Sequence, residues 1–222
     1  MAAAARGAGA AAQVRAARKR GLAAVPLLEA EAPRDPFILF QRWYREAHEA
    51  GAPQPDAMAL ATYGEEGPSA RMVLFKGLED GAFLFYSNYA SLKGRDLVHD
   101  RRAALVFYWF VTHHQVRVAG AVRRLGRAAS EQYFATRPRG AQLSALASRQ
   151  SKILRSRQAL EERVSELAER YPDDVPLPRE WGGYALRPRW IEFWESREDR
   201  LHDRLRYVLR SNGAWRIERL AP

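Results

Sequence analysis

Residues 114–125 read HQVRVAGAVRRL, and this stretch decides the class of fold. Val116, Val118 and Val122 recur at even spacing, with polar or smaller residues between them. Side chains alternate between the two faces of a strand, so the three valines share one face. One buried and one exposed face is typical of antiparallel sheets, whereas parallel strands are buried on both faces. The stretch therefore predicts a half-buried antiparallel strand.

Short runs of a similar kind lie before and after this stretch. They are rich in β-branched and aromatic residues, and Gly, Asp and Asn residues separate them. The breaks EEGPS (65–69) and LEDGA (78–82) are typical of hairpins. We expect further strands within residues 57–63, 69–77, 82–88, 103–110, 182–188, 189–196, 204–210 and 214–222.

Amphipathic segments predict helices between these runs. The first helix begins with Asp35 as N-cap and Pro36 in its first turn, and GAPQP (51–55) ends it. Further helices are expected within residues 91–100, 127–138 and 156–171. This order of elements is not the βαβ alternation of a parallel nucleotide-binding sheet. It predicts a mainly β protein with peripheral helices (α+β), and a closed antiparallel barrel fits it best.

Composition narrows the function classes. The 222 residues include no cysteine, which excludes disulfides and thiolate catalysis and favours a reducing, cytoplasmic compartment. No apolar run reaches the roughly 20 residues that cross a bilayer, so we expect no membrane partner. Small and basic residues dominate the start of the chain. We expect residues 1–30 to form a flexible basic arm and residues 31–222 to form a single domain.

A net charge of +10 is typical of proteins that bind nucleic acid. All but four of the 36 cationic residues are arginine, however, and they form no basic stripe interleaved with aromatic residues. This pattern indicates a bias in composition, and we expect no nucleic-acid partner. Where a lysine remains, arginine is not equivalent, because lysine changes its protonation state far more readily. The lysines are Lys19, Lys76, Lys93 and Lys152.

Common catalytic and nucleotide-binding motifs, such as GxGxxG, GxxxxGK[ST], GxSxG and HExxH, are absent. The adjacent His113 and His114 would point to opposite faces of a strand, so we expect no metal site. What remains is a set of cations and amides at strand ends and turns. In FYSNYASLKG (85–94) a strand leads into a helix, whose first N–H groups form a natural phosphate site. The candidate side chains there are Tyr86, Ser87, Ser91 and Lys93.

Spacing constrains two further pairs. Arg71 and Lys76 are five residues apart, so a regular strand puts them on opposite faces. They can serve one ligand only if Lys76 lies at the end of the strand, or across a subunit interface. Tyr133 and Arg137 are four residues apart, which places them on one face of a helix.

The stretch DRLHDRLRY (199–207) carries cationic side chains at alternate positions. If it is a strand, residues 200, 202, 204 and 206 share one face. Leu201, Leu205 and Tyr207 then point the other way, toward a core.

Ten motifs, in order along the chain, resemble those of the pyridoxamine 5′-phosphate oxidase (pyridoxine 5′-phosphate oxidase) family, from about Asp35 to Pro222. They are SARMVLFKG (69–77), FYSN (85–88), SLKG (91–94), HQVRVAG (114–120), YFATRPRGAQ (133–142), SRQS (148–151), WGGY (181–184), IEFW (191–194), RLHDRLRY (200–207) and RLAP (219–222). The resemblance implies an antiparallel split β-barrel that forms a homodimer, with FMN at the subunit interface and the carboxyl-terminal strands in dimerisation and substrate binding. The implied activity is oxidation of pyridoxamine or pyridoxine 5′-phosphate to pyridoxal 5′-phosphate (EC 1.4.3.5). Dioxygen would be the acceptor, with hydrogen peroxide and, from the amine, ammonia as products.

The resemblance also implies site residues, position by position. Arg200 and His202 would lie over the substrate ring as catalytic residues. The substrate-binding residues would be Lys76, Tyr133, Arg137, Arg200, His202 and Arg15. The FMN-binding residues would be Arg71, Met72, Val73, Leu74, Lys76, Tyr86, Ser87, Lys93, Gln115, Gln150, Ser151, Trp194 and Arg204.

Five positions depart from the family pattern. An arginine is expected at Leu92 and at His114, a serine at Ala141, a glutamine at Glu195 and a tyrosine at Arg18. The phenazine-pathway oxidases resemble this family and similarly relax the two arginines. An FMN oxidase that acts on another planar aromatic is therefore an alternative, and a non-catalytic flavin or pyridoxal phosphate binder is another. The residues of the substrate-phosphate site, Lys76, Tyr133 and Arg137, favour a phosphorylated substrate.

Overall fold

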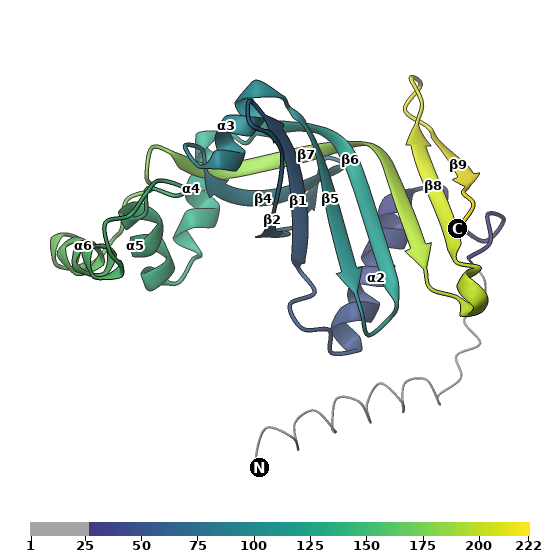
Figure 1. Ribbon diagram of the computed structural model, residues 1–222, viewed down its shortest axis with the longest axis horizontal. Helices are drawn as coiled ribbons and strands as arrows, with labels where there is room; N and C mark the ends of the chain where they lie inside the picture. The colour runs from purple at the N-terminus through teal and green to yellow at the C-terminus, as the bar shows by residue number, and fades with distance from the viewer. Residues whose placement is uncertain (1–26) are drawn as a thin grey trace, which may run out of the picture. The chain divides into compact units, whose positions relative to one another are not determined.

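The computed structural model describes residues 27–222 (Figure 1). Arg15, Arg18 and most of the expected flexible arm lie outside the described residues. The helices are α2 (Pro36–Glu49), α3 (Leu92–His99), α4 (Arg127–Ala135), α5 (Arg139–Ala147), α6 (Arg157–Arg170) and the short 3-10 helix η1 (Glu198–Arg200). The strands are β1 (Ala57–Gly64), β2 (Gly67–Leu74), β3 (Leu78–Glu79), β4 (Ala82–Asn88), β5 (Arg102–Trp109), β6 (His114–Arg124), β7 (Trp181–Glu195), β8 (Asp203–Leu209) and β9 (Trp215–Arg219).

The strands of the described residues form one mostly antiparallel sheet. Its hydrogen-bonded order is β2-β1-β5-β6-β7-β4-β3, while β8 pairs with β7 and β9 pairs with β8. This path ends at β2 and at β3 without returning to its start, so the expectation of a closed barrel is wrong. A mainly antiparallel, open sheet with five α-helices confirms the α+β class and agrees with the split barrel that the resemblance implies.

Strand β6 confirms the alternation predicted for residues 114–125. Val116 and Val118 are fully buried and Val122 nearly so, whereas the intervening residues are more exposed. Gly120 interrupts the valine series for a steric reason. A Cβ atom at that position would lie 1.9 Å from the carbonyl oxygen of Arg187 on β7, so only glycine fits.

Packing divides the described residues into two compact units, and each is described by itself. The central unit comprises Asp56–Leu105 and Val118–Arg189. The terminal unit comprises the described residues up to Pro55 together with Val106–Arg117 and Trp190–Pro222. The assignment of residues 31–222 to one domain stays a prediction.

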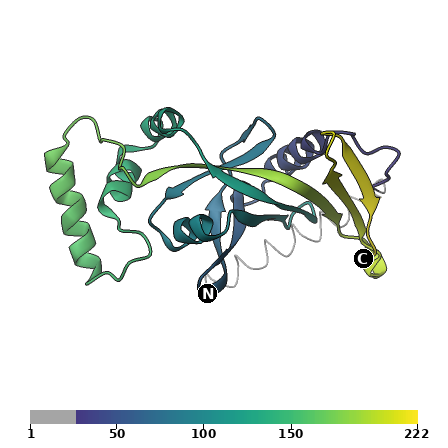
Figure 2. The ribbon, with the colours of Figure 1, turned by 90° about the horizontal axis from the view of Figure 1, so that it is seen from above.

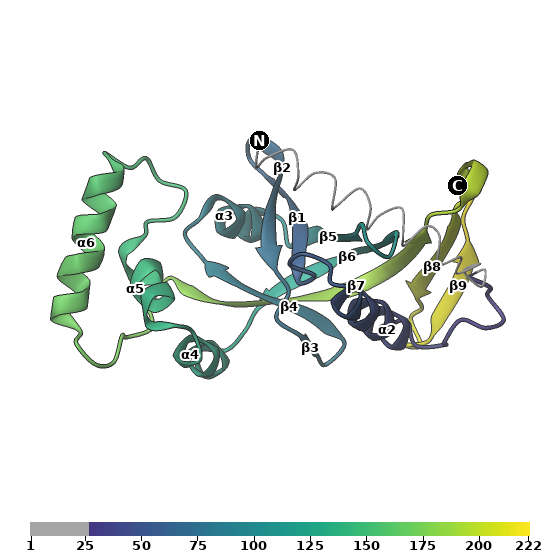
Figure 3. The same cartoon turned by 90° about the horizontal axis from the view of Figure 1, so that it is seen from below.

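In the central unit, β1 and β4 supply much of the core. β1 alternates, with Met58 and Leu60 fully buried, whereas β4 buries nearly every residue, including Phe83 and Phe85. Figure 1 shows α3 beside β1. Figures 2 and 3 show α4, α5 and α6 gathered at one end of this unit, with α6 outermost. In agreement with that position, α6 fully buries none of its residues.

In the terminal unit, α2 begins as predicted. The Asp35 carboxylate accepts a hydrogen bond from the backbone N–H of Phe37 at 2.9 Å, and Pro36 is the first helical residue. The apolar face of the helix packs on aromatic residues of β5 and β7. The buried residues of this core include Leu39, Phe40, Trp43, Phe107, Phe193 and Tyr207.

Strand β8 begins at Asp203, so the strand expected within residues 204–210 forms but does not extend back through residues 199–202. Asp199 and Arg200 have φ angles of 52° and 60°, a left-handed conformation that a strand does not contain. The expectation that Arg200 and His202 share a strand face with Arg204 is therefore wrong.

The apolar side of the same stretch follows its prediction only within the strand. Leu205 and Tyr207 are fully buried, as predicted. Leu201 lies before the strand and is 70% exposed, so its predicted core position is wrong.

The helix expected within residues 127–138 ends early. α4 stops at Ala135, and α5 starts at Arg139 after Pro138. Proline disfavours helical conformation in the residue before it and has no N–H to continue the helix. Arg137 therefore lies in the link, and helical spacing is the wrong reason to pair it with Tyr133.

Candidate functional site

The junction between β4 and α3, in the central unit, brings several predicted residues together. Ser91 is the N-cap of α3, and its hydroxyl oxygen accepts from the Gly94 N–H at 3.3 Å. Lys93 Nζ donates to Ser91 Oγ at 3.2 Å and to Gln150 Oε1 at 2.9 Å. Ser87 Oγ donates to the same Gln150 oxygen at 3.2 Å. We call Ser87, Ser91, Lys93 and Gln150, together with Arg71, the α3 cluster.

Lys93 is a buried cation, with 7% of its surface exposed. Burial lowers the pKa of Lys93 to about 8, and the positive charge of Arg71 adds to this effect, while Asp96 opposes it. Within the described residues, its hydrogen bonds go to neutral oxygens. Burying a cation among neutral groups costs free energy that a bound anion offsets. The cluster therefore fits the phosphate group of a ligand.

Arg71 lies on β2, and both amino groups of its guanidinium are held within the protein. Nη1 donates to Thr62 Oγ1 at 2.6 Å and to the Leu60 carbonyl at 3.2 Å. Nη2 donates to Ser69 Oγ at 2.7 Å and lies 3.4 Å from Asp96 Oδ2. Burial lowers the pKa of Arg71, and the charge of Asp96 opposes this shift. Arg71 thus adds a fixed positive charge to the α3 cluster.

A stack of aromatic rings forms a second group in the central unit. The ring centroids of Tyr86 and Tyr133 are 3.8 Å apart, and Trp181 stacks at 5.6 Å from Tyr86. The guanidinium of Arg137 lies over Trp181, with Cζ 4.8 Å from the ring centroid. Its Nη1 is buried and has no hydrogen-bond partner among the described residues. Tyr133 and Arg137 therefore do meet, through Trp181 rather than through one helix face.

Lys76 can serve the same ligand as Arg71 only if it lies at the end of the strand or across a subunit interface, and the structure meets the first condition. β2 ends at Leu74, so Lys76 lies beyond the end of the strand. Its Nζ donates to Asp56 Oδ2 at 3.2 Å. On β2 itself, Met72 and Leu74 are exposed on the face opposite Val73. Roles for these strand residues toward a flavin stay predictions.

The terminal unit holds the other predicted residues. The rings of Trp194 and His202 lie 4.7 Å apart. His202 Nδ1 accepts a hydrogen bond from the Arg197 backbone N–H at 3.1 Å, so a neutral His202 carries its proton on Nε2. Arg200, two residues earlier, is exposed in η1. The structure thus brings Trp194 and His202 together and leaves the Arg200 side chain at the surface of this unit.

Arg204 is paired inside the terminal unit. Its Nε and Nη2 donate to Glu192 Oε1 at 3.0 and 2.8 Å, and its Nη1 donates to the Ala221 carbonyl at 2.7 Å. Glu192 is 3% exposed and also accepts from Arg117 Nη1 at 3.2 Å. Sequence reasoning missed this carboxylate as the partner of Arg204. A contact between Arg204 and a flavin stays a prediction.

Two departures from the family pattern meet in the terminal unit. The His114 ring stacks on Trp43 with centroids 3.9 Å apart, and His114 Nε2 lies 3.8 Å from Glu195 Oε1. His114 precedes Gln115, and Glu195 follows Trp194. The pair therefore adjoins two of the predicted FMN-binding residues. The roles of Gln115 and of the exposed Ser151 stay predictions.

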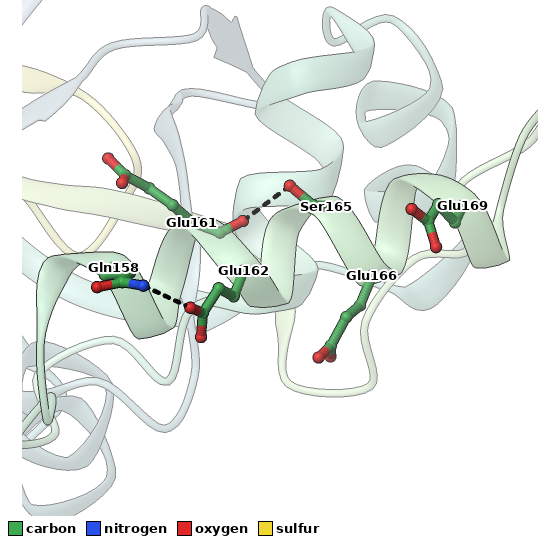
Figure 4. A pocket seen from close by; sticks show the side chains of 6 residues that line it. All are labelled: Gln158, Glu161, Glu162, Ser165, Glu166 and Glu169. Atoms are coloured by element: carbon green, nitrogen blue, oxygen red, sulfur yellow. Dashed lines mark hydrogen bonds between the residues drawn. The ribbon is translucent and has the colours of Figure 1, made fainter.

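The hollow drawn in Figure 4 contains none of the predicted site residues. It is lined by Gln158, Glu161, Glu162, Ser165, Glu166 and Glu169. All six belong to α6, and the acidic side chains are solvated on its outer surface. A single acidic helix face repels phosphate, so this hollow does not fit a phosphorylated ligand.

Sequence reasoning missed Thr62, Asp96 and Trp181. A signal for Asp96 was present, because it follows Lys93 by three residues in a predicted helix and therefore lies on the same face. Trp181 begins the WGGY motif but no local pattern gave it a role, and none pointed to Thr62, because both roles depend on contacts between distant segments.

Comparison with protein families gives two matches. The model described as "Pyridoxamine 5'-phosphate oxidase" matches residues 44–171. The model described as "Pyridoxine 5'-phosphate oxidase C-terminal dimerisation region" matches residues 181–222. Together they cover most of the chain.

Curated relatives and solved structures agree with these matches. A pyridoxine/pyridoxamine 5′-phosphate oxidase of Burkholderia orbicola (strain MC0-3) is 48% identical over 197 residues, covering 87% of this chain and 92% of the relative. The protein of the same name from Salinispora arenicola (strain CNS-205) is 48% identical over 199 residues, covering 88% and 90%. A crystal structure of PhzG from Burkholderia lata 383, in complex with tetrahydrophenazine-1-carboxylic acid, superposes with a TM-score of 0.84 at 32% identity, covering 91% of this chain and 100% of PhzG.

Two kinds of feature are absent from the described residues. None of their helices is long and apolar enough to cross a membrane. Residues 27–222 also contain no group of three or more His, Asp or Glu residues placed to hold a metal ion.

The pKa of Lys93 predicts how pH affects binding of FMN, the cofactor that the sequence resemblance implies. Below pH 8 the ammonium group attracts the phosphate, and above pH 8 it loses its proton. The dissociation constant for FMN should then rise by up to about tenfold per pH unit above pH 8. Flavin fluorescence titrations between pH 6.5 and 9.5 measure this slope.

Two variants and one ligand serve as controls. Lys93→Met should bind FMN more weakly with a flat pH profile, and Lys152→Met, at an exposed lysine, should keep the wild-type slope. Riboflavin, which lacks the phosphate, should show no slope with any of the proteins. A flat wild-type profile for FMN contradicts this assignment of Lys93.

Proposed function

The chain belongs to the pyridoxamine 5′-phosphate oxidase family, and on that premise we propose that it oxidises pyridoxamine and pyridoxine 5′-phosphate to pyridoxal 5′-phosphate. It is an oxidoreductase, and its cofactor is FMN. Dioxygen is the proposed acceptor. Oxidation of the alcohol consumes one dioxygen and yields one hydrogen peroxide, whereas oxidation of the amine also consumes water and releases ammonia.

The α3 cluster would hold the phosphate of FMN. Arg71 and Lys93 supply positive charge, and Ser87 and the first N–H groups of α3 supply hydrogen-bond donors. When bound, FMN supplies the redox chemistry, acceptance of a hydride from C4′ of the substrate and reoxidation by dioxygen. The protein then needs no side-chain nucleophile, which agrees with a chain that contains no recognisable catalytic triad.

The single observation that carries a phosphorylated substrate is the buried, unpaired Nη1 of Arg137. A buried guanidinium N–H without an acceptor is costly, and a phosphate oxygen would satisfy it. Tyr133 lies in the same aromatic stack over Trp181. Lys76, Tyr133 and Arg137 would together hold the substrate phosphate.

Arg200 and His202 would act at the pyridine ring. The exposed Arg200 could stabilise negative charge that develops during hydride transfer. His202, with Nδ1 occupied by the Arg197 N–H, presents Nε2 as the group that donates or relays a proton. Arg15 lies outside the described residues, so its proposed part in substrate binding rests on the sequence resemblance.

The carboxyl-terminal family match supports a homodimer, since it is described as a dimerisation region. In the proposal each FMN lies at the subunit interface, and neither nucleic acid nor membrane is a partner. A cytoplasmic location stays a prediction.

A second function has support from one observation. PhzG, which superposes well on this chain, was crystallised with tetrahydrophenazine-1-carboxylic acid. This chain also has Leu92 and His114 where the family pattern has arginine. An FMN oxidase acting on a planar aromatic without a phosphate is therefore the alternative. A third possibility is a flavin binder without turnover.

A direct assay separates the three functions. FMN-loaded protein mixed with pyridoxine 5′-phosphate in air should produce pyridoxal 5′-phosphate absorbance and peroxide in equal amounts. Tetrahydrophenazine-1-carboxylic acid in the parallel reaction should give no comparable turnover. Oxidation of the phenazine alone supports the alternative, and bound FMN without turnover of either compound supports a binder.

Replacement of Arg137 tests the substrate-phosphate site. Arg137→Leu should raise KM for pyridoxine 5′-phosphate roughly 10- to 100-fold, because a charge-assisted contact is lost. The FMN dissociation constant should not change. Arg163→Leu, at an exposed arginine on α6, is the matched control. An unchanged KM for Arg137→Leu argues against the site.

Replacement of Arg200 tests the catalytic proposal. Arg200→Ala should lower kcat by about 100-fold while FMN content stays at the wild-type level. Arg206→Ala, at an arginine paired with Glu218 through Nη2 at 2.7 Å, should have little effect on kcat. Unchanged turnover in Arg200→Ala removes Arg200 from the mechanism.

A further inference from the structure

A buried carboxylate lies beside the α3 cluster, and the proposed function gives it no role. Asp96 is on α3, three residues after Lys93, and is 5% exposed. A carboxylate next to a phosphate-binding group opposes binding by repulsion. Its presence there therefore requires a compensating benefit.

The contacts of Asp96 indicate that benefit. Thr62 Oγ1 donates to Asp96 Oδ2 at 2.7 Å, and the same Thr62 oxygen accepts from Arg71 Nη1 at 2.6 Å. Arg71 Nη2 lies 3.4 Å from Asp96 Oδ2. The carboxylate, the hydroxyl and the guanidinium thus form a closed three-membered arrangement, which we call the Asp96 triad.

The triad supplies two of the four acceptors that hold the Arg71 guanidinium. The two amino groups of a guanidinium carry four hydrogens, and here they face four acceptors. These acceptors are the Leu60 carbonyl, Thr62 Oγ1, Ser69 Oγ and Asp96 Oδ2. The Nε–H of Arg71 has no acceptor among the described residues. Arg71 can therefore offer a ligand only its Nε–H as a hydrogen-bond donor, together with the positive charge of the guanidinium.

The backbone around the triad is also shaped to admit the carboxylate. Gly64 ends β1, and a Cβ atom there would lie 2.3 Å from Asp96 Oδ1. Gly94, two residues before Asp96 on α3, lies so close to the Tyr89 carbonyl that a Cβ would be 2.1 Å from its oxygen. Glycine at position 64 lets α3 and the β1–β2 hairpin approach until Asp96 reaches Arg71, and glycine at position 94 lets α3 start close to the backbone of residues 88–89.

We propose that Asp96, through Thr62, is a positioning residue that locks the Arg71 guanidinium against α3, so that Arg71 and Lys93 together receive the phosphate of FMN. The inference rests on the proposed function, because it takes the α3 cluster as the FMN phosphate site. Asp96 joins the helix that carries Lys93 to the strand that carries Arg71. It thereby fixes the relative placement of the two cations, at the cost of one opposing charge.

The sign of the effect of Asp96→Ala separates positioning from simple electrostatics. If Asp96 acted only as a charge, its removal would tighten FMN binding, because one repulsive group is lost. If Asp96 positions Arg71, its removal releases the guanidinium and weakens binding. Thr62→Val keeps every charge and nearly the same volume while breaking the triad, so it tests positioning without any change of charge.

The experiment measures dissociation constants of FMN and of riboflavin for the full-length protein stripped of flavin, by quenching of flavin fluorescence. Asp96→Ala and Thr62→Val should each raise the FMN dissociation constant about tenfold and leave that of riboflavin unchanged. Thr62→Ser, which retains the hydroxyl, should restore wild-type FMN affinity. Asp100→Asn removes a charge at the other end of α3, where Asp100 pairs with Arg102, and should change neither constant.

Three results would overturn the inference. If Asp96→Ala binds FMN more tightly than the wild type, Asp96 acts on FMN only by electrostatic repulsion. Equal weakening of FMN and riboflavin shows general damage to the fold instead of positioning at the phosphate. Wild-type affinity in Thr62→Val shows that the triad does not matter. Failure of the proposed phosphate site looks different, because the wild-type protein would then bind FMN no more tightly than riboflavin. Failure of the proposed reaction shows only in the turnover assay and leaves these dissociation constants unchanged.

Discussion

An excess of buried positive charge is the constraint on which the central unit depends. Arg71 and Lys93 face one carboxylate, Asp96, and the remaining partners of Lys93 are neutral oxygens. The depressed pKa of Lys93 reports the cost of that arrangement in the protein alone. A phosphate removes the imbalance, so the local fold is built for the liganded state. The N-cap of α3, the glycine at position 94 and the hairpin of β1 and β2 all serve to bring these charges together.

Local patterns in the sequence predicted what local physics determines. The alternation of Val116 and Val118 identified a half-buried strand, and Asp35 with Pro36 identified the start of a helix. The junction at Ser91 identified a helix N-terminus beside Lys93. Each of these features depends on residues within a few positions of one another, and the structure confirms them.

The predictions that failed depend on backbone breaks or on distant segments. Alternation alone extended a strand through Arg200, because nothing in the spacing reveals a left-handed φ angle. Helical spacing paired Tyr133 with Arg137, although Pro138 ends the helix and Trp181, more than 40 positions later, is what they share. Sequence reasoning also missed Glu192, which pairs with Arg204 from the neighbouring strand, while a contact between Arg204 and a flavin stays a prediction. The sequence of a single strand does not reveal which residues of the neighbouring strand lie beside it.

His114 and Glu195, two of the five expected departures from the family pattern, contact each other. Compared position by position, the two residues are separate replacements in distant parts of the chain. In space, His114 Nε2 lies 3.8 Å from Glu195 Oε1, and the His114 ring stacks on Trp43. Replacing either residue alone with the one expected from the family resemblance removes one member of this contact, so we expect the effects at the two positions to be coupled. Exchange of sequence between this chain and its relatives should therefore change residues 114 and 195 together.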